Sequence, residues 1–178
     1  EMNRTWIILG ATSAMARAFA RAVAEDGASV LLAGRDMEDI AALASDCRLR
    51  GAPVADALAF DAREPGGFAA LIERMEAEEG ELNAAVFVGS MPEQAAIDAD
   101  PALLDGTVTD SFSGPARFLQ MLAPVMEARG GGTVVGVGSV GLLQLGIWVA
   151  MAVVTMTYRG AILGVFGLEA SGWNVPAL

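Results

Sequence analysis

The deciding stretch of this sequence reads Thr5-Trp6-Ile7-Ile8-Leu9-Gly10-Ala11-Thr12-Ser13-Ala14-Met15-Ala16. Its first five residues are apolar enough to form a buried strand. Gly10 permits a tight turn, and a helix is predicted over residues 14–25 with Gly27 as its C-cap. A strand, a tight turn and a helix in this order indicate an α/β fold.

The rest of the chain repeats this alternation of strand and helix. A mostly parallel, doubly wound sheet is therefore expected, with helices on both faces in a Rossmann-like, three-layer α/β/α arrangement. We expect a single domain over residues 1–178, without internal repeats or linkers. Further strands are predicted over 29–33, 54–60, 84–88 and 133–137, and further helices over 36–50, 67–79 and most of 105–128, with a bend at Gly114-Pro115.

Four suggestive turns follow predicted strands. They are Gly10–Ser13, Gly34-Arg35, Asp61-Ala62 and Gly89-Ser90. Parallel strands end at the same edge of a sheet, and ligands of such sheets bind beyond that edge. The turns therefore predict one binding site assembled from four separate parts of the sequence.

The composition excludes several classes of function. The formal charge of −11 disfavours a nucleic-acid backbone as partner. The chain contains no histidine and no lysine, which excludes Ser-His-Asp and Cys-His catalysis, Schiff bases and a phosphate-loop lysine. Cys47 is the single cysteine, so we expect no metal site and no internal disulfide. No basic segment precedes the first apolar strand, and together with the lone cysteine this favours a cytoplasmic protein.

The turn Gly10-Ala11-Thr12-Ser13-Ala14-Met15-Ala16 resembles the glycine-rich turn of the short-chain dehydrogenase/reductase family, with alanine at the second and third glycine positions. The resemblance implies that the turn and the first residues of the helix bind the phosphates of a dinucleotide. Hydroxyl donors at positions 12 and 13 would add to the backbone amides. The alternative is a strand-helix turn that binds nothing. The cofactor-binding residues implied here are Gly10, Thr12, Ser13, Ala14 and Met15.

Arg35 follows the second strand, where NAD-selective proteins carry an acid that binds the ribose hydroxyls. An arginine suits the 2′-phosphate, so the resemblance implies NADP rather than NAD. Alternatively, Arg35 is a solvated side chain paired with Asp36 or Glu38, and Asp36 itself is a candidate helix cap. The remaining cofactor-binding residues that the resemblance implies are Asp61, Ala62 and Gly89. Asp61 resembles the family's aspartate near the adenine ring. It is equally compatible with a purely structural role in the turn.

The catalytic half matches the family less well. Ser139 falls where the family places the serine that binds the substrate oxygen, and it is the one catalytic residue carried over. The expected asparagine is replaced in the stretch from Asp110 to Gly114. The family's Tyr-x-x-x-Lys is not present, because Tyr158 is the only tyrosine and is followed four residues later by Ile162. An unassisted phenol titrates near 10 and is a poor acid-base catalyst at neutral pH.

The segment Leu142–Tyr158 is uncharged and long enough to cross a membrane. The resemblance implies instead a helix buried between subunits, and we expect a homo-oligomer formed through apolar helices. A membrane contact and a sequence irregularity are the alternatives. Family members also continue past position 178 into substrate-binding elements, so the domain is expected to be truncated at its carboxyl end.

The sequence therefore predicts an NADP(H)-dependent oxidoreductase of the short-chain type, acting on a carbonyl or alcohol substrate with impaired catalytic residues. The alternative is a non-catalytic nucleotide-binding or scaffold subunit that keeps the fold. A third reading is a membrane-associated subunit.

Overall fold

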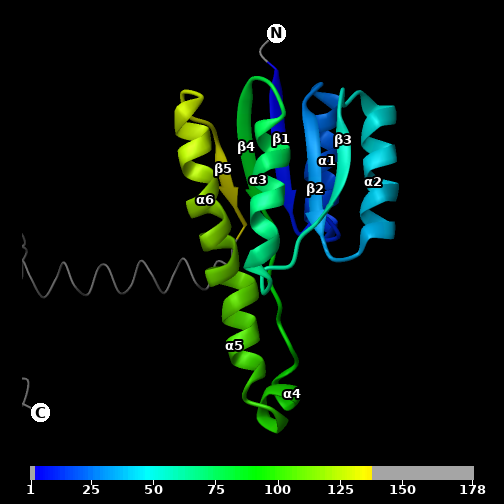
Figure 1. Cartoon of the computed structure of the whole chain (residues 1–178). Helices are drawn as coiled ribbons and strands as arrows, with labels where there is room; N and C mark the ends of the chain where they lie inside the picture. The colour runs from blue at the N-terminus through cyan, green and yellow to red at the C-terminus, as the bar shows by residue number, and fades with distance from the viewer. Residues whose placement is uncertain (1–2, 138–178) are drawn as a thin grey trace, which may run out of the picture. The chain divides into compact units, whose positions relative to one another are not determined.

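Five parallel strands form one sheet at the centre of the computed structural model, which describes residues 3–137. The strand order is β3-β2-β1-β4-β5, so the chain leaves β1 in one direction, returns across it and continues on the other side (Figure 1). The switch point lies between β1 and β4. The strands are β1 (Arg4–Leu9), β2 (Ser29–Gly34), β3 (Ala55–Ala59), β4 (Glu81–Val86) and β5 (Val134–Gly136).

Helices cover both faces of this sheet. One face carries α1 (Ala14–Glu25) and α2 (Met37–Arg50). The other carries α3 (Phe68–Glu76), which follows the 3-10 turn η1 (Pro65–Gly67), and α6 (Gly114–Ala128). The predicted doubly wound, three-layer α/β/α fold is confirmed.

The alternating side chains of β1 divide the core into two clusters. Ile7 and Leu9 point into the cluster beneath α3 and α6, whereas Ile8 points into the cluster beneath α1 and α2. All three are fully buried. This two-sided burial explains why the strand is apolar at every position from Trp6 to Leu9.

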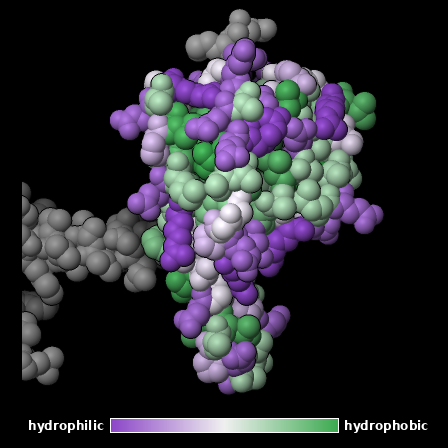
Figure 2. Space-filling view, in the orientation of Figure 1, coloured by the Kyte–Doolittle hydropathy of each residue, from purple (hydrophilic) through white to green (hydrophobic). Residues whose placement is uncertain are grey.

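A helical arm departs from this three-layer arrangement. It consists of α4 (Gln94–Ala99), α5 (Leu103–Val108) and the π-helical turn η2 (Thr109–Ser113), which leads directly into α6. Figure 1 shows α4 and α5 extending past the carboxyl edge of the sheet, and Figure 2 shows hydrophobic residues among hydrophilic ones on this arm. Leu104, Val108 and Phe112, spaced four apart, all have exposed side chains.

Most predicted elements agree with the structure to within three residues at each end. The helix over 14–25 and the start of the second strand are confirmed as predicted. The C-cap of this helix is Asp26, and the predicted Gly27 follows it with a left-handed φ of 77°. The strand predicted over 84–88 was placed too late, because β4 begins at Glu81 where it pairs with Arg4 of β1. The interruption predicted near Gly114-Pro115 takes the form of the π-helical turn immediately before that pair.

Two sequence-based predictions lie outside the described residues: the apolar segment Leu142–Tyr158 and Ser139. Within residues 3–137, every helix is too short or too polar to cross a bilayer. The prediction of one domain over the full chain also extends beyond the described part.

Candidate functional site

A pocket of about 290 Å³ lies at the carboxyl edge of the sheet. The turns that follow β1, β2, β3 and β4 all contribute to its wall, and Asp110 from the π-helical turn also lines it. Seven of the predicted cofactor-binding residues line this pocket: Gly10, Thr12, Ser13, Arg35, Asp61, Ala62 and Gly89. The predicted Ala14 and Met15 are exposed at the start of α1 and do not line it.

A larger hollow of about 980 Å³ lies at the opposite, amino-terminal edge. Its wall carries four glutamates, Glu76, Glu78, Glu79 and Glu81, against the single cation of Arg129. This excess of negative charge disfavours an anionic ligand. Ligands of doubly wound sheets also bind at the carboxyl edge, so we place the candidate site in the smaller pocket.

Gly10 shapes the turn between β1 and α1. Its φ of 78° lies in the left-handed region, and its amide donates to the Ala33 carbonyl at 2.8 Å. A Cβ at this position would lie 2.9 Å from the carbonyl carbon of Phe87, at the end of β4. Only glycine satisfies both the backbone conformation and this close approach. The turn is therefore held tightly against the switch point of the sheet.

The start of α1 presents unpaired amides beside this turn. Ser13 is the N-cap, and its Oγ accepts from the Ala16 amide at 3.1 Å. The amides of Ala14 and Met15 have no intrahelical acceptor, as is usual for the first turn of a helix. The first turn contains no acidic residue that would cancel the positive end of the helix dipole. This arrangement is suited to bind an anionic group.

The Thr12 carbonyl is fixed from outside the turn. Arg17 donates to it through Nε at 3.1 Å and forms an ion pair with Asp39 on α2. The turn is thus tied to both helices on this face of the sheet.

Arg35 and Asp36 adopt different roles after β2. Asp36 caps α2 by accepting from the Asp39 amide at 3.1 Å, which confirms the predicted helix cap. Arg35 is exposed in the pocket wall and forms no salt bridge with any residue of 3–137. Pairing of Arg35 with Asp36 or Glu38 is therefore not observed within that range. The Arg35 guanidinium is available for an anion in the pocket.

Asp61 stabilises the turn after β3. One of its carboxylate oxygens, Oδ1, accepts from the Arg63 amide at 2.9 Å, as in the structural turn that we considered as its alternative role. Asp61 is only partly buried, and it lines the pocket. Its position is therefore compatible with both roles.

Asp110 also lines the pocket, although its place there was not predicted from the sequence. Its side chain is only 9% exposed and pairs with Arg63, whose Nε and Nη2 donate to Oδ1 and Oδ2, each at 2.7 Å. These hydrogen bonds hold the pKa of the Asp110 carboxyl below its ordinary value, against burial, which raises it. The sequence signal was a charged residue inside a predicted helix, between two glycines four residues away on either side.

Ser111, the next residue, contacts the turn after β4. Its Oγ accepts from the Ser90 amide at 3.3 Å. The Ser90 hydroxyl is close enough to the Asp110 carboxyl to lower its pKa, yet within residues 3–137 this buried hydroxyl has no partner in hydrogen-bond geometry. The π-helical turn therefore contacts the turns that follow β3 and β4.

A comparison with known families decides the identity of this fold. The family model of the short chain dehydrogenases matches residues 4–151, which is most of the chain. The chain belongs to the short-chain dehydrogenase/reductase family. The sheet order, the glycine turn and the pocket described above are features of this fold, and the resemblance seen in the sequence is confirmed.

The relatives found by sequence are longer than this chain. An uncharacterized oxidoreductase of Mycobacterium tuberculosis is 30% identical over 135 residues, which is 75% of this chain and 54% of the relative. The dehydrogenase/reductase SDR family member 7B of Bos taurus is 26% identical over 144 residues, covering 78% of this chain and 44% of the relative. The chain therefore spans about half the length of these short-chain dehydrogenase/reductase relatives.

Solved structures of the family share the fold. A short-chain dehydrogenase from Sphingobium yanoikuyae in complex with NADPH matches with a TM-score of 0.69 and 24% identity, over 77% of this chain and 54% of that protein. The L-sorbose reductase from Gluconobacter frateurii, complexed with NADPH and L-sorbose, matches with a TM-score of 0.71 and 23% identity, over 80% and 55%.

Proposed function

We propose that this chain is the nucleotide-binding part of a short-chain oxidoreductase and binds NADP(H) at the carboxyl edge of its sheet. The observation that carries the proposal is the exposed guanidinium of Arg35, which lines the same pocket as Thr12 and Ser13 and forms no salt bridge with any residue of 3–137. Similar proteins from Sphingobium yanoikuyae and Gluconobacter frateurii form complexes with NADPH, which supports the choice of cofactor.

The residues present fit such a dinucleotide. The amides of Ala14 and Met15 and the hydroxyls of Thr12 and Ser13 would hold the pyrophosphate at this turn, which Gly10 allows to lie close against the backbone of Phe87 and Val88. Arg35 would bind the 2′-phosphate through charge-assisted hydrogen bonds. Asp61, Ala62 and Gly89, which also line the pocket, would border the adenine.

The bound nicotinamide would supply or accept a hydride from the carbon of a carbonyl or alcohol substrate. Ser139 would orient the substrate oxygen, as the family resemblance implies. The 178 residues contain no Tyr-x-x-x-Lys to move the proton. Losing a general acid typically reduces the rate by about 10²–10⁴, so turnover should be slow.

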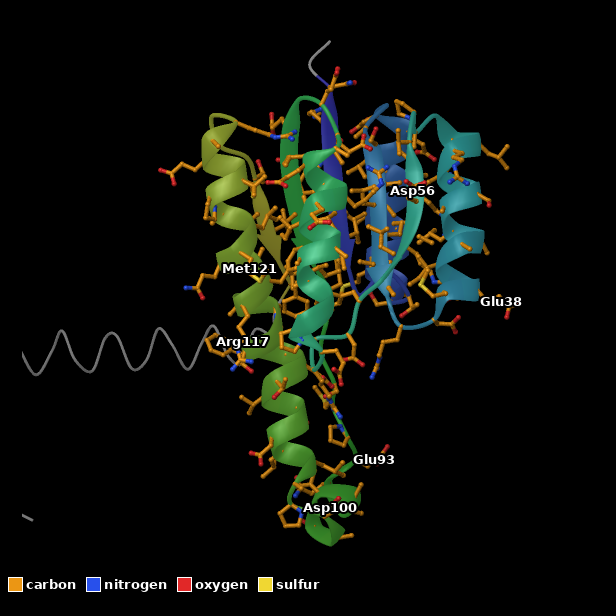
Figure 3. All side chains as sticks on the ribbon, in the orientation of Figure 1. Glu38, Asp56, Glu93, Asp100, Arg117 and Met121 are labelled. Carbon is orange, nitrogen blue, oxygen red and sulfur yellow. The ribbon has the colours of Figure 1, made fainter. Side chains whose placement is uncertain are left out.

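The cofactor proposal is tested by titrating the protein with NADPH and NADH and following nicotinamide fluorescence. Arg35→Ala should weaken NADPH binding by about 10- to 100-fold, the effect of losing a hydrogen-bonded charge pair, and leave NADH binding unchanged. Arg117→Ala is the matched control, because this exposed arginine lies on α6 outside the pocket (Figure 3). The proposal fails if the unmodified chain binds neither nucleotide, or if Arg35→Ala weakens both equally.

A non-catalytic nucleotide-binding or scaffold subunit is the second candidate. The absence of any lysine in the 178 residues favours it, because the family's tyrosine depends on a lysine to lower its pKa. Sensitive turnover assays with a panel of ketones, aldehydes and alcohols separate the two functions. Saturable NADPH oxidation would exclude the scaffold, whereas binding without turnover would exclude the oxidoreductase.

Self-association through apolar helices also stays a proposal. The exposed strip of Leu104, Val108 and Phe112 on the arm supports it. Sedimentation of the full chain should give at least a dimer, and a monomer at micromolar concentration would contradict the proposal.

A further inference from the structure

One side of the helical segment from α5 to α6 lies unusually close to the turn that follows β3. Three residues spaced four apart form this contact, namely Gly106, Asp110 and Gly114. A Cβ at Gly106 would lie 2.7 Å from Nη2 of Arg63. A Cβ at Gly114 would lie 2.4 Å from the carbonyl oxygen of Ala62. Each glycine therefore leaves the space that the turn occupies.

Asp110 lies between the two glycines. Its carboxylate accepts hydrogen bonds from the Arg63 side chain, which passes over Gly106. The fork of two 2.7 Å hydrogen bonds fixes the guanidinium plane relative to the carboxylate. The Asp110 side chain is only 9% exposed, while that of Arg63 is 47% exposed. The contact thus anchors a surface turn to a buried point on the helix.

The anchored turn is part of the pocket. Asp61 and Ala62 line it directly, and Asp61 accepts the amide of Arg63 at 2.9 Å. Movement of Arg63 would therefore displace Asp61 and Ala62. The π-helical turn also contacts the turn after β4, because the Ser90 amide donates to the Ser111 hydroxyl. Turns of π-helix are frequent at functional sites, because the extra residue redirects side chains.

We propose that Arg63 and Asp110 form a latch that positions the wall of the pocket after β3 against a bound adenine nucleotide. This inference rests on nucleotide binding by the pocket. Arg63 acts through Asp61 and Ala62 and is therefore a positioning residue, whereas Asp110 holds Arg63 in place and also lines the pocket itself. Without the latch, the wall would have to be ordered when the nucleotide binds, and this ordering would weaken affinity.

The test measures NADPH and 2′,5′-ADP affinity by calorimetry at a temperature where circular dichroism shows every variant to be folded. Asp110→Asn keeps the shape of the side chain but loses the charged fork. Gly106→Ala leaves both latch residues in place, and its methyl group pushes the guanidinium away from its seat. Because Gly106 has an ordinary helical φ, alanine there should not harm folding.

We expect Asp110→Asn and Gly106→Ala each to lower the affinity for both nucleotides by about tenfold, the usual size of such couplings. The double variant Gly106→Ala/Asp110→Asn should bind no more weakly than either single variant, because both changes break the same contact. Arg63→Lys, which keeps the charge without the fork, should fall between Arg63→Gln and the unmodified chain. A merely stabilising ion pair would leave all these affinities unchanged in folded protein.

Asp56→Asn is the matched control. Asp56 lies on β3 (Figure 3) and accepts from Nε and Nη2 of Arg74 at 3.2 and 2.6 Å, away from the pocket. The nucleotide affinity of the Asp56→Asn variant should equal that of the unmodified chain. Tight binding by all the variants would overturn the latch alone. A lack of binding by the unmodified chain would overturn the proposed function, and the latch with it.

Discussion

At the scale of single residues, the two members of the Arg63–Asp110 pair are in unequal environments. The carboxylate is buried and the guanidinium is half exposed. Arg63→Met should therefore cost about 2 kcal/mol of unfolding free energy, since it leaves a buried charge unpaired. Asp110→Asn should cost about 1 kcal/mol, because the freed guanidinium can be solvated. Urea unfolding at pH 7 measures both, and equal losses would contradict this account.

Gly10 and Gly27 have nearly the same φ angle but lie in different surroundings. Their φ angles are 78° and 77°, but a Cβ at Gly27 would meet nothing within 4 Å, whereas one at Gly10 would meet the backbone of Phe87 and Val88. Gly27→Ala should cost about 1 kcal/mol from left-handed strain alone. Gly10→Ala should cost about 3 kcal/mol or more, because backbone must also move.

Thermal unfolding of the two glycine variants, side by side, measures the difference. Gly10→Ala should also weaken NADPH binding in the fluorescence titration, since the displaced turn would no longer hold the phosphates. Similar melting temperatures for both variants would show that the close approach to β4 does not constrain this turn.

At the scale of helices and strands, the first helix depends on its cap. Ser13→Ala removes the hydroxyl that accepts the Ala16 amide and should cost about 1 kcal/mol. Ser45→Ala is the matched control, because the Ser45 hydroxyl bonds back to the Ala41 carbonyl on an exposed face within α2. This second change should be neutral or slightly stabilising. Urea midpoints compare the two, and an equal loss would argue against the cap.

Local signals explain why some elements were predicted well. The α1 helix has a capping serine before it and Gly27 after it, and both signals depend only on neighbouring residues. The start of β4 was missed because Glu81 and Asn83 are polar, and pairing with β1 makes them part of the strand. The α4 helix was missed because its six residues bury no side chain, so they show no apolar period.

The same distinction holds for the site. The four pocket turns were predicted because each directly follows a strand, and parallel strands end at one edge. The latch was not predicted, because Arg63 and Asp110 are 47 positions apart and meet only after α3 and β4 have packed. Their contact is a property of tertiary structure, although the spacing of Gly106, Asp110 and Gly114 is visible in the sequence.

At the scale of the whole molecule, ion pairs join the elements of a strongly acidic chain. Asp46 on α2 accepts from Nε of Arg21 on α1 at 2.7 Å and from Nε of Arg50 at 2.9 Å. These hydrogen bonds, that from Arg21 first, lower the pKa of the Asp46 carboxyl. Asp46 thus ties together the two helices on one face, as Asp110 ties the arm to the turn after β3.

The lowered pKa values of the Asp46 and Asp110 carboxyls determine how these two residues make the stability of the fold depend on pH. Their pKa values are lowered below the ordinary 3.8, so in the folded chain they bind protons less readily than in the unfolded chain. Their stabilising effect is therefore complete above pH 3.8 and is lost as the pH falls through the folded values. Repulsion among the acids acts oppositely, because the net charge of −11 at pH 7 shrinks toward zero near the isoelectric point of about 4.3.

We therefore expect the urea midpoint to hold or rise from pH 7 to about 4.5 and to fall steeply below about 3.8. Asp46→Asn/Asp110→Asn should be less stable at pH 7 and should lose less on acidification, so that the two curves converge in acid below pH 3.8. The 41 residues from 138 to 178 carry only Arg159 and Glu169, so the effect arises in the described part of the chain. Parallel curves for the two proteins would show that other groups control acid unfolding.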